Sequence, residues 1–405
     1  MHVFVKGVAA LVVASALTGG SAATAQAVEA GQHASARLGG ASAGSWSESV
    51  LPMGDAQATV IARPDAFTTW VAGSRAGVLD GPKPRLVFSP VLVGRDARDG
   101  GIWREIALPQ LPAGSDVQVH GADASSARSG MLVGDFDPLL EGMLTERWDG
   151  ASWRVIPAPV PESTLGAGLL DVDEISPRDA WAVGYAEILD GVVIDPVTGR
   201  PQQLSHTEPV VRHWDGTAWQ VVATPPIADG GILLSVTALA PDDVWAVGRS
   251  MEMKPVIMHY DGTAWTSVPV SVPNGELRDV VARGPHEVWA VGGTRDTDGT
   301  LDGLVLRFDG HTWQRVTLPD GVEMLDQATA VRGGFAAVGN REGDDTAFAV
   351  ALENGRLRSL NLAVPAGTTA SGINGAGPEL LVTAYRTDTT SPGYRPIPLL
   401  LTGCR

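Results

Sequence analysis

A single cysteine, Cys404, stands next to the C-terminal residue of this 405-residue chain. One thiol cannot form an internal disulfide, so we expect the fold to be stabilised by packing alone. Lysine is almost as scarce, since only Lys6, Lys83 and Lys254 occur, and the formal net charge is −17. Because so acidic a chain repels phosphate groups, we expect no nucleic acid and no anionic membrane surface among its partners.

Long apolar runs are also missing, and a helix needs about 20 such residues to cross a bilayer. The first run, residues 7–17, ends shortly before two consecutive glycines, so we expect no membrane span. It follows a weakly basic start and precedes small residues up to Ala27, which is typical of a secretory signal peptide. We expect residues 1–27 to be cleaved, 28–43 to be a flexible segment, and the mature protein to be secreted.

What the sequence does contain is an internal repeat, which decides the fold before any single motif does. Three consecutive units carry Trp-Ala-Val-Gly at residues 181–184, 245–248 and 289–292. Each then carries Asp-Gly-x-x-Trp, at residues 215–219, 261–265 and 309–313. Asp-Gly between apolar segments is a strong hairpin signal, because that turn needs positive φ. With the short alternating segment before Trp-Ala-Val-Gly, each unit predicts four antiparallel strands.

Weaker copies and the two chain ends complete a ring. The second-strand pattern recurs at residues 69–73, 130–134 and 335–339. Ser45–Pro52 matches a fourth strand with no strands before it, and Ser371–Leu401 matches three strands with no fourth. Joining the two ends would hide exposed strand edges. We therefore predict an all-β, seven-bladed β-propeller of four-stranded antiparallel blades, one domain over residues 44–405, closed by an N-terminal outer strand in the last blade.

The Asp-Val-Trp-Ala-Val-Gly and Asp-Gly-x-x-Trp units resemble those of exported propeller proteins of actinobacteria. The Trp-Ala-Val strands are also similar to tectonin-type lectin propellers, and the hairpins resemble a shortened sialidase Asp-box. The full Ser-x-Asp-x-Gly-x-Thr-Trp box, the Gly-Gly of kelch blades and the Gly-His of WD repeats are not met. The resemblance implies an exported propeller, and a fold of this kind does not by itself assign a function.

One face of such a ring carries both the connections between blades and those between second and third strands. We call it the loop-rich face. Its connections vary, from short at Arg249–Pro255 to long at Ser74–Leu86 and Glu187–Pro209. Loops of variable length on a rigid scaffold are where binding usually resides, although unconstrained drift would give the same pattern.

Four residues occupy the same position of the first strand in successive units: Asp171, Ser235, Asp279 and Gln327. We expect them at the mouth of the central channel on the loop-rich face, where a polar ring suits a cation or the hydroxyls of a sugar. The alternative is that they only hydrogen-bond water and neighbouring backbone.

Asp296, Asp298 and Asp302 surround a glycine turn and resemble part of a calcium loop. The distal Glu of a full loop is missing, so a plain polar hairpin is the alternative. Calcium binding is therefore expected to be weak at most, and no other cofactor is expected.

Catalytic motifs are not present: there is no His-Glu-x-x-His, Gly-x-Ser-x-Gly or phosphate-binding glycine loop. His213 and His259 occupy the repeat position that Arg147 and Arg307 fill, which indicates a strand surface rather than a metal site. The repeated Asp-Gly aspartates are interpreted as turn residues.

These observations favour a secreted, non-catalytic binding module that recognises a glycan or an extracellular protein through the loop-rich face. One alternative is a carbohydrate-active lyase or hydrolase using Asp171 and Asp279. Another is a subunit of a larger secreted assembly. Carboxylates a few ångströms apart at the channel mouth would favour the enzyme.

Overall fold

The computed structural model describes residues 46–405 apart from 80–83, 113, 137–141, 198, 343–344, 354, 377–378, 388–394 and 405. The predicted signal peptide (1–27) and flexible segment (28–43) lie outside the described residues. Within the described ranges the chain forms antiparallel strands and one short 3-10 helix, η1 (Ala97–Asp99), with no α-helix. No helix in these ranges is long and apolar enough to cross a membrane.

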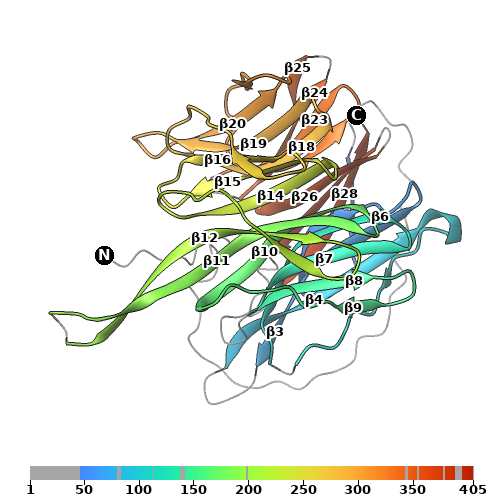
Figure 1. The fold of residues 1–405 in the computed structure, drawn as a ribbon. Coiled ribbons are helices and arrows are strands. Elements are labelled where there is room, and N and C mark those ends of the chain that lie inside the picture. The colour runs from blue at the N-terminus through green and yellow to red at the C-terminus, as the bar shows by residue number, and fades with distance from the viewer. Residues whose placement is uncertain are drawn as a thin grey trace.

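The strands form four-stranded units in which order along the chain is order in the sheet (Figure 1). The first unit contains β2 (Ala56–Ala62), β3 (Thr68–Leu79), β4 (Arg85–Asp96) and β5 (Arg104–Glu105). Next come β6 (Val117–Ser126), β7 (Ser129–Phe136), β8 (Met143–Trp148) and β9 (Trp153–Val155). The third contains β10 (Thr164–Ser176), β11 (Asp179–Ile194), β12 (Pro201–Trp214) and β13 (Trp219–Val222). One bridged pair, Gly168 with Asp135, joins these last two units into an eight-stranded sheet.

Three further units follow the same order. They are β14 (Gly231–Ala240), β15 (Asp243–Ser250), β16 (Pro255–Tyr260) and β17 (Trp265–Ser267); β18 (Gly275–Gly284), β19 (Glu287–Arg295), β20 (Leu301–Phe308) and β21 (Trp313–Arg315); and β22 (Leu325–Val331), β23 (Gly334–Asn340), β24 (Ala347–Glu353) and β25 (Arg356–Leu360). The last sheet holds β26 (Thr368–Ala376), β27 (Glu379–Thr387), β28 (Pro396–Cys404) and, as its outer strand, β1 (Trp46–Val50).

The N-terminal strand therefore completes the C-terminal sheet. Trp46 pairs with Gly403, and a Cβ added at Gly403 would lie 2.5 Å from the Trp46 ring, so only glycine fits beneath the indole. Glu48 accepts two hydrogen bonds from Arg386, at 3.0 and 2.7 Å. Chain segments more than 330 residues apart are joined here by backbone pairing, side-chain packing and charge.

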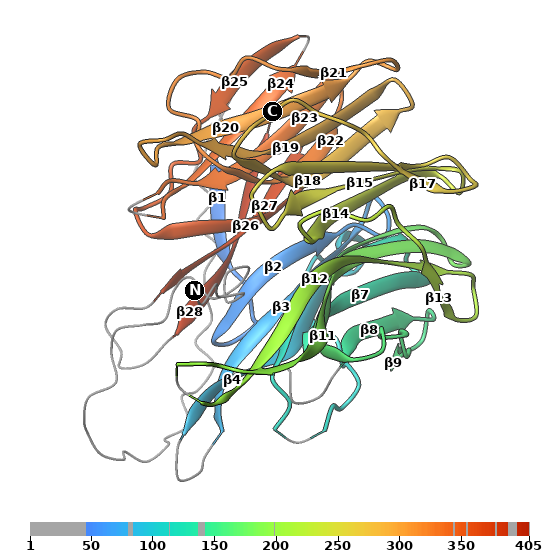
Figure 2. The same cartoon turned by 60° about the vertical axis from the view of Figure 1, so that its left-hand side comes forward.

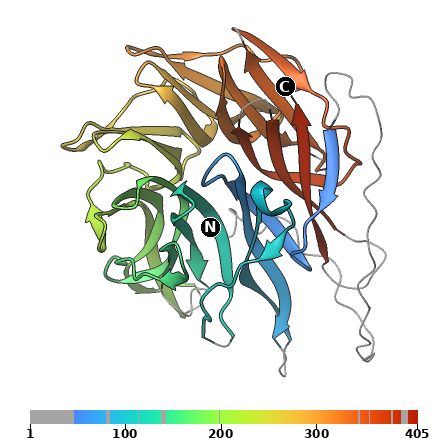
Figure 3. The ribbon, with the colours of Figure 1, turned by 90° about the vertical axis from the view of Figure 1, so that its right-hand side faces the viewer.

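The first strands of the units contact one another in a closed cycle. β2 contacts β6, and the series continues through β10, β14, β18, β22 and β26, which contacts β2 again. At this last junction Ser371 donates a hydrogen bond from its hydroxyl to the carbonyl oxygen of Ala58. Figure 3 shows the sheets side by side around one centre.

Indole rings pack the units together. The second-strand tryptophan of one unit meets the fourth-strand tryptophan of the next, edge to face. The centroid distances are 5.7 Å for Trp70–Trp153, 5.7 Å for Trp181–Trp265 and 5.4 Å for Trp245–Trp313. Where the repeat has lost its outer tryptophan, Trp289 packs instead with Phe335 and Leu357. The repeated tryptophans of the sequence thus form the packing contacts between neighbouring sheets.

The Asp-Gly turns behave as expected. Asp215 accepts hydrogen bonds from the amides of Thr217 and Ala218 at 2.8 and 2.9 Å, and Gly216 has a φ of 92°. The same pattern is found at Asp149, Asp261 and Asp309. Interpreting these aspartates as turn residues is confirmed.

The two long connections on the loop-rich face differ from expectation, because they are strands rather than loops. β3 and β4 stay paired from Thr68–Asp96 to Leu79–Arg85, and β11 and β12 from Ala180–Trp214 to Ile194–Pro201. Both hairpins extend past the other strands of their sheets (Figure 2). In the second segment the β-branched run Val192-Val193-Ile194 favours a strand, which the variable length of the connections did not indicate.

Removing Trp46–Val50 should destabilise the whole fold. The deletion exposes the edge of β28 and uncovers the half-buried Trp46 site, for which a loss of about 3 kcal/mol is expected, at the lower end for a tryptophan. Thermal unfolding of the mature chain with and without these residues is the measurement. Ser47→Ala, at an exposed position of the same strand, serves as control. Equal melting temperatures for the deleted and full chains would contradict a stabilising role for β1.

Candidate functional site

Every first strand contains a β-bulge at the same repeat position. The pairing with the second strand skips one residue, and the skipped residues are Thr59, His120, Leu170, Leu234, Arg278, Asp326 and Ser371. A bulge turns the following side chain to a new direction. Asp171, Ser235, Asp279 and Gln327 each come directly after a bulge, so their equivalence in the sequence is also an equivalence in space.

Three of these four side chains meet. The hydroxyl of Ser235 on β14 lies 2.9 Å from Oδ2 of Asp171 on β10 and 2.5 Å from Oδ1 of Asp279 on β18. Within the described residues Gln327 does not join these hydrogen bonds. We expected these residues at the mouth of the channel. The three that meet lie in the middle of their strands, where Ser235 and Asp279 are buried and Asp171 is half-buried.

The two carboxylates also bind the backbone of the next first strand. Asp171 Oδ2 accepts from the amide of Val236 at 2.9 Å, and Asp279 Oδ2 accepts from the amide of Ala328 at 2.6 Å. Their other oxygens accept from the amides of the residues that directly follow them, both at 2.8 Å. Every oxygen of the two carboxylates is therefore engaged by a donor of the protein.

A proton has to be shared in this group. The Ser235 hydroxyl has one hydrogen but lies within hydrogen-bonding distance of two carboxylates, so both contacts are filled only when one carboxyl is protonated. Burial, and then the charge of Asp279, raises the pKa of Asp171 to about 7. Burial likewise raises the pKa of Asp279 to about 6.

Similar links occur one step further along the strands. Asp173 accepts from the amide of Ala238 at 3.0 Å, and Asp123 accepts from the amide of Glu174 at 2.8 Å. Glu174 in turn accepts from the hydroxyl of Ser129 at 2.5 Å. Burial raises the pKa of all three carboxyl groups. Acidic side chains thus fasten successive first strands to one another.

The suggested calcium segment forms a capped turn. Asp296 accepts from the amides of Asp298 and Thr300 at 3.0 and 2.9 Å, which uses its carboxylate within the turn. Asp298 and Asp302 are exposed. In the part of the chain that the structure describes, no three His, Cys, Asp or Glu side chains converge as ligands for one metal ion. Binding of calcium here stays a prediction.

The sequence analysis missed a second set of polar residues, at the position directly after each Trp-Ala-Val-Gly strand. In chain order they are Ser74, Asp135, Tyr185, Arg249, Asn340 and Tyr385, with Gly293 as the exception. These residues lie within the second strands, on the side of the loop-rich face. The signal was available, because aligning the units on the glycine, or on Ala384 in the last unit, places all of them in one column.

Two residues of this set, Arg249 and Asn340, belong to a continuous network. Its other members are Glu276, Arg278 and Asp326 of the first strands. Arg249 contacts Glu276 at 3.0 Å, and Arg278 contacts Glu276 at 2.7 Å and also Asp326. Asn340 donates to Asp326 at 3.0 Å. Burial alone would lower the pKa of Arg278, but the charges of Asp326 and Glu276 outweigh it and hold that pKa above its ordinary value. The Arg278 side chain nevertheless remains 41% exposed.

Across from this network the polar residues are an imidazole, a carboxylate and a phenol. Nε2 of His120 lies 3.2 Å from Oδ2 of Asp135. Burial, followed by the charges of Asp135 and Glu187, raises the pKa of Tyr185 to about 12, so the phenol stays protonated. The described chain therefore offers both donors and acceptors around the axis on this face.

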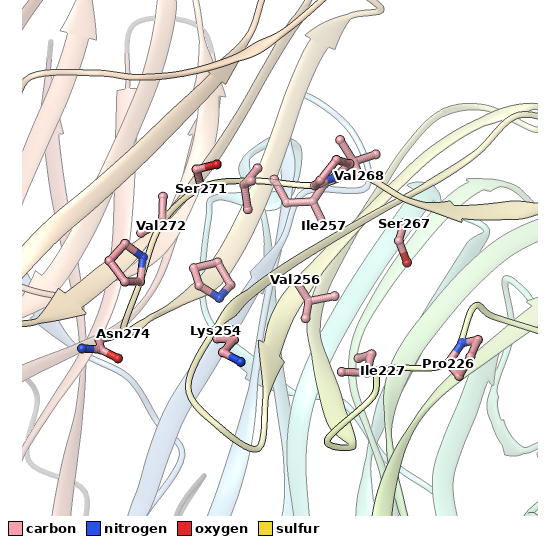
Figure 4. A pocket seen from close by; sticks show the side chains of 14 residues that line it. Pro226, Ile227, Lys254, Val256, Ile257, Ser267, Val268, Ser271, Val272 and Asn274 are labelled. Carbon is pink, nitrogen blue, oxygen red and sulfur yellow. The ribbon is translucent and has the colours of Figure 1, made fainter.

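A groove of about 590 Å³ lies farther out, between β16 and the linker from β17 to β18 (Figure 4). Its walls are mainly aliphatic, from Val256, Ile257 and the linker residues 268–273. Lys254 lies at the groove and contacts Glu252 at 2.7 Å. A second cavity of about 570 Å³ occupies the same place in the first unit, between β4 and residues 106–112. Both cavities therefore lie between the third strand of a unit and the linker that follows its fourth strand.

The repeat histidines serve packing. His213 stacks on Trp181 at 4.4 Å and contacts Asp179 at 2.9 Å, and His259 repeats this with Trp245 at 4.1 Å. Each imidazole covers the indole of the residue with which it pairs on the neighbouring strand. This agrees with a strand-surface role rather than a metal site.

The buried acid pair makes stability depend on pH. Because both pKa values are raised above the ordinary value near 4, the protonated forms favour the folded state. Their contribution is complete below about pH 4 and is lost as pH rises through about 6 and 7. We expect the melting temperature to fall between about pH 5 and about pH 8. Asp171→Asn, which mimics the protonated acid, should make that fall smaller.

The control for this measurement is Asp302→Asn, at an exposed position of β20, which should follow the wild-type pH profile. A wild-type melting temperature that stays level or rises over this range, or an unchanged slope in Asp171→Asn, would refute the shared proton.

Calcium should leave the protein almost unchanged. A ligand that binds only the folded state at 100 times its Kd adds about 2.7 kcal/mol, which a thermal melt detects easily. Melts with millimolar calcium and with excess chelator are expected to coincide. A shift of several degrees that Asp298→Ala abolishes would instead identify the Asp296–Asp302 segment as a calcium site.

Comparison with known proteins supports the type of fold and no more specific property. No protein-family model and no curated protein matches the sequence. Among solved structures, the WD40 β-propeller domain of Doa1 is 11% identical with a TM-score of 0.51, over 87% of this chain and 95% of that one. A chain of the mitotic checkpoint complex is 10% identical with a TM-score of 0.53, over 88% and 94%. Acylaminoacyl peptidase is 14% identical with a TM-score of 0.51, over 86% of this chain and 51% of that one.

A fungal lectin with a six-bladed β-propeller fold, from Aleuria aurantia, is 12% identical with a TM-score of 0.42, over 78% of this chain and all of that one. The matches above 0.5 agree with the packed four-stranded sheets, and the chain has a β-propeller-like fold.

Proposed function

We propose that this chain is a secreted, non-catalytic binding module that holds a glycan on its loop-rich face. Residues 44–405 would form one ring of seven four-stranded blades, closed by β1, with residues 1–27 removed on export. The observation that carries the proposal is the network around Arg278, a residue near the middle of β18 whose side chain is 41% exposed.

The chemistry of the network suits sugar hydroxyls. The two arginines and the two carboxylates balance in charge, and Asn340 adds an amide donor. Hydroxyl groups both donate and accept, so they can bind guanidinium and carboxylate groups of one neutral site. A neutral ligand also avoids the repulsion that a net charge of −17 imposes on anions. An extracellular protein on the same face is the alternative ligand.

A lyase or hydrolase remains the competing function, and one observation favours it. Asp171 and Asp279 both lie within hydrogen-bonding distance of Ser235, which is the close approach of carboxylates that an enzyme would need. Against it, all four carboxylate oxygens already accept protein donors and Ser235 is 1% exposed. A general acid must reach the substrate, so this pair serves the scaffold.

A glycan array probed with the purified mature protein tests the proposal. Arg278→Gln should weaken binding to any hit about tenfold to a hundredfold, the loss expected for charge-assisted hydrogen bonds of about 1.5–3 kcal/mol. Arg283→Gln is the matched control, because Arg283 lies on the same strand but pairs with Glu287 near its far end. Melting temperatures of both variants show that the fold persists.

Two results would overturn the proposal. One is a folded mature protein that binds no glycan, and the other is a hit whose affinity survives Arg278→Gln. Release of sugar or an unsaturated product from a bound glycan, abolished by Asp279→Asn, would establish the enzyme instead.

A further inference from the structure

A two-stranded arm projects from the third unit. It consists of Leu189–Ile194 of β11 and Pro201–His206 of β12, joined by the turn that follows Ile194. The pairing of β10 with β11 reaches only to Ile188, and β13 covers β12 only from Val211 onward. Figures 1 and 2 show this hairpin running out from the remainder of the ring. Beyond its root, the arm is paired only with itself.

The arm exposes aliphatic side chains on both of its faces. Val192 and Ile194 are 57% and 63% exposed, and Val193 on the opposite face is 43% exposed. Leu204 and, at the tip, Val197 are exposed as well. An isolated two-stranded hairpin is marginally stable in water, and clusters of exposed aliphatic residues mark interaction surfaces. The arm therefore has the features of a segment that binds another surface.

The outer edge of the arm lacks the usual protection against pairing. Strand edges are normally guarded by charged side chains or by proline within the strand. Residues 201–205 are Pro-Gln-Gln-Leu-Ser, with no charge and proline only at the first position, and the ion pair of His206 with Asp190 lies at the root of the arm. This contrasts with the charge of −17 carried by the chain as a whole. An uncharged edge in so acidic a protein leaves a place where a second copy can approach.

We propose that the arm is a dimerisation element, in which the outer edges of β12 from two copies pair antiparallel across a two-fold axis. A two-fold interface uses the same surface on both copies, so the edge must be complementary to itself. Glutamine and serine side chains satisfy this, because amides and hydroxyls both donate and accept hydrogen bonds. A charged residue at the axis would instead lie opposite the same charge on the other copy. A basic peptide would gain nothing from the uncharged edge.

The dimer is weak and strengthens with salt. One added strand pair of this length falls well below the interface area of about 1,200–2,000 Å² that stable complexes bury, so affinity in the micromolar range or weaker follows. Repulsion between two acidic copies adds to this at low ionic strength and is screened at high ionic strength. Most protein interfaces built on ion pairs show the opposite salt dependence.

Sedimentation equilibrium of the mature protein, in dilute buffer and in about 0.5 M sodium chloride, tests the proposal. The wild type should associate at least several-fold more tightly in high salt. Gln203→Lys places a like charge on each side of the two-fold axis and should weaken association at least tenfold. The added lysine also makes each copy less negative, which weakens the long-range repulsion between copies. A loss of affinity therefore cannot be attributed to that long-range repulsion.

Val221→Lys is the matched control, since it adds the same charge at an exposed position of β13 in the same unit and should dimerise like the wild type. A wild type that stays monomeric in both buffers, or a Gln203→Lys dimer of unchanged affinity, overturns the proposal. Arg278→Gln should dimerise normally, so failure of glycan binding and failure of dimerisation are separate outcomes.

Discussion

The edge-to-face contact of indoles between neighbouring sheets is the interaction on which the rest of this structure depends. A four-stranded sheet has two faces to bury, and this chain has no disulfide to hold its sheets together. Trp181 on Trp265 and Trp245 on Trp313 solve this by joining the second strand of one unit to the fourth strand of the next. The same repeat that builds a sheet therefore also sets the angle to its neighbour.

Nearer the axis, acidic side chains connect the sheets. Asp171, Asp173 and Asp279 each reach from one first strand to a backbone amide of the next, so burial is compensated by hydrogen bonds rather than by cations. The cost is mutual repulsion among carboxylates, which protonation relieves. An acidic protein with few lysines thus holds its centre together through hydrogen-bonded acids and shared protons.

The repeat made strand order predictable from the sequence, and with it the pairing of β1 with β28, because Trp-Ala-Val-Gly and Asp-Gly act locally. The depth of Asp171 was not predictable, since a bulge shifts the register by one residue without a mark in the sequence. The β11–β12 arm was taken for a loop because strand propensity there had no partner strand to confirm it. The Arg278 network depends on contacts between units, which spacing within a unit does not encode.

The position of these features has a consequence for how ligands could act together. The Arg278 network belongs to first and second strands that are fixed on both sides by neighbouring sheets, whereas the arm is held only at its root. A ligand near the axis would meet a preorganised site and change little in the sheets around it. An arm that pairs with another copy would order a segment remote from that site. Because the arm beyond its root is paired only with itself, we expect binding at the axis and pairing of the arms to be thermodynamically independent. Two copies joined by their arms would then gain affinity for a multivalent surface only through effective concentration.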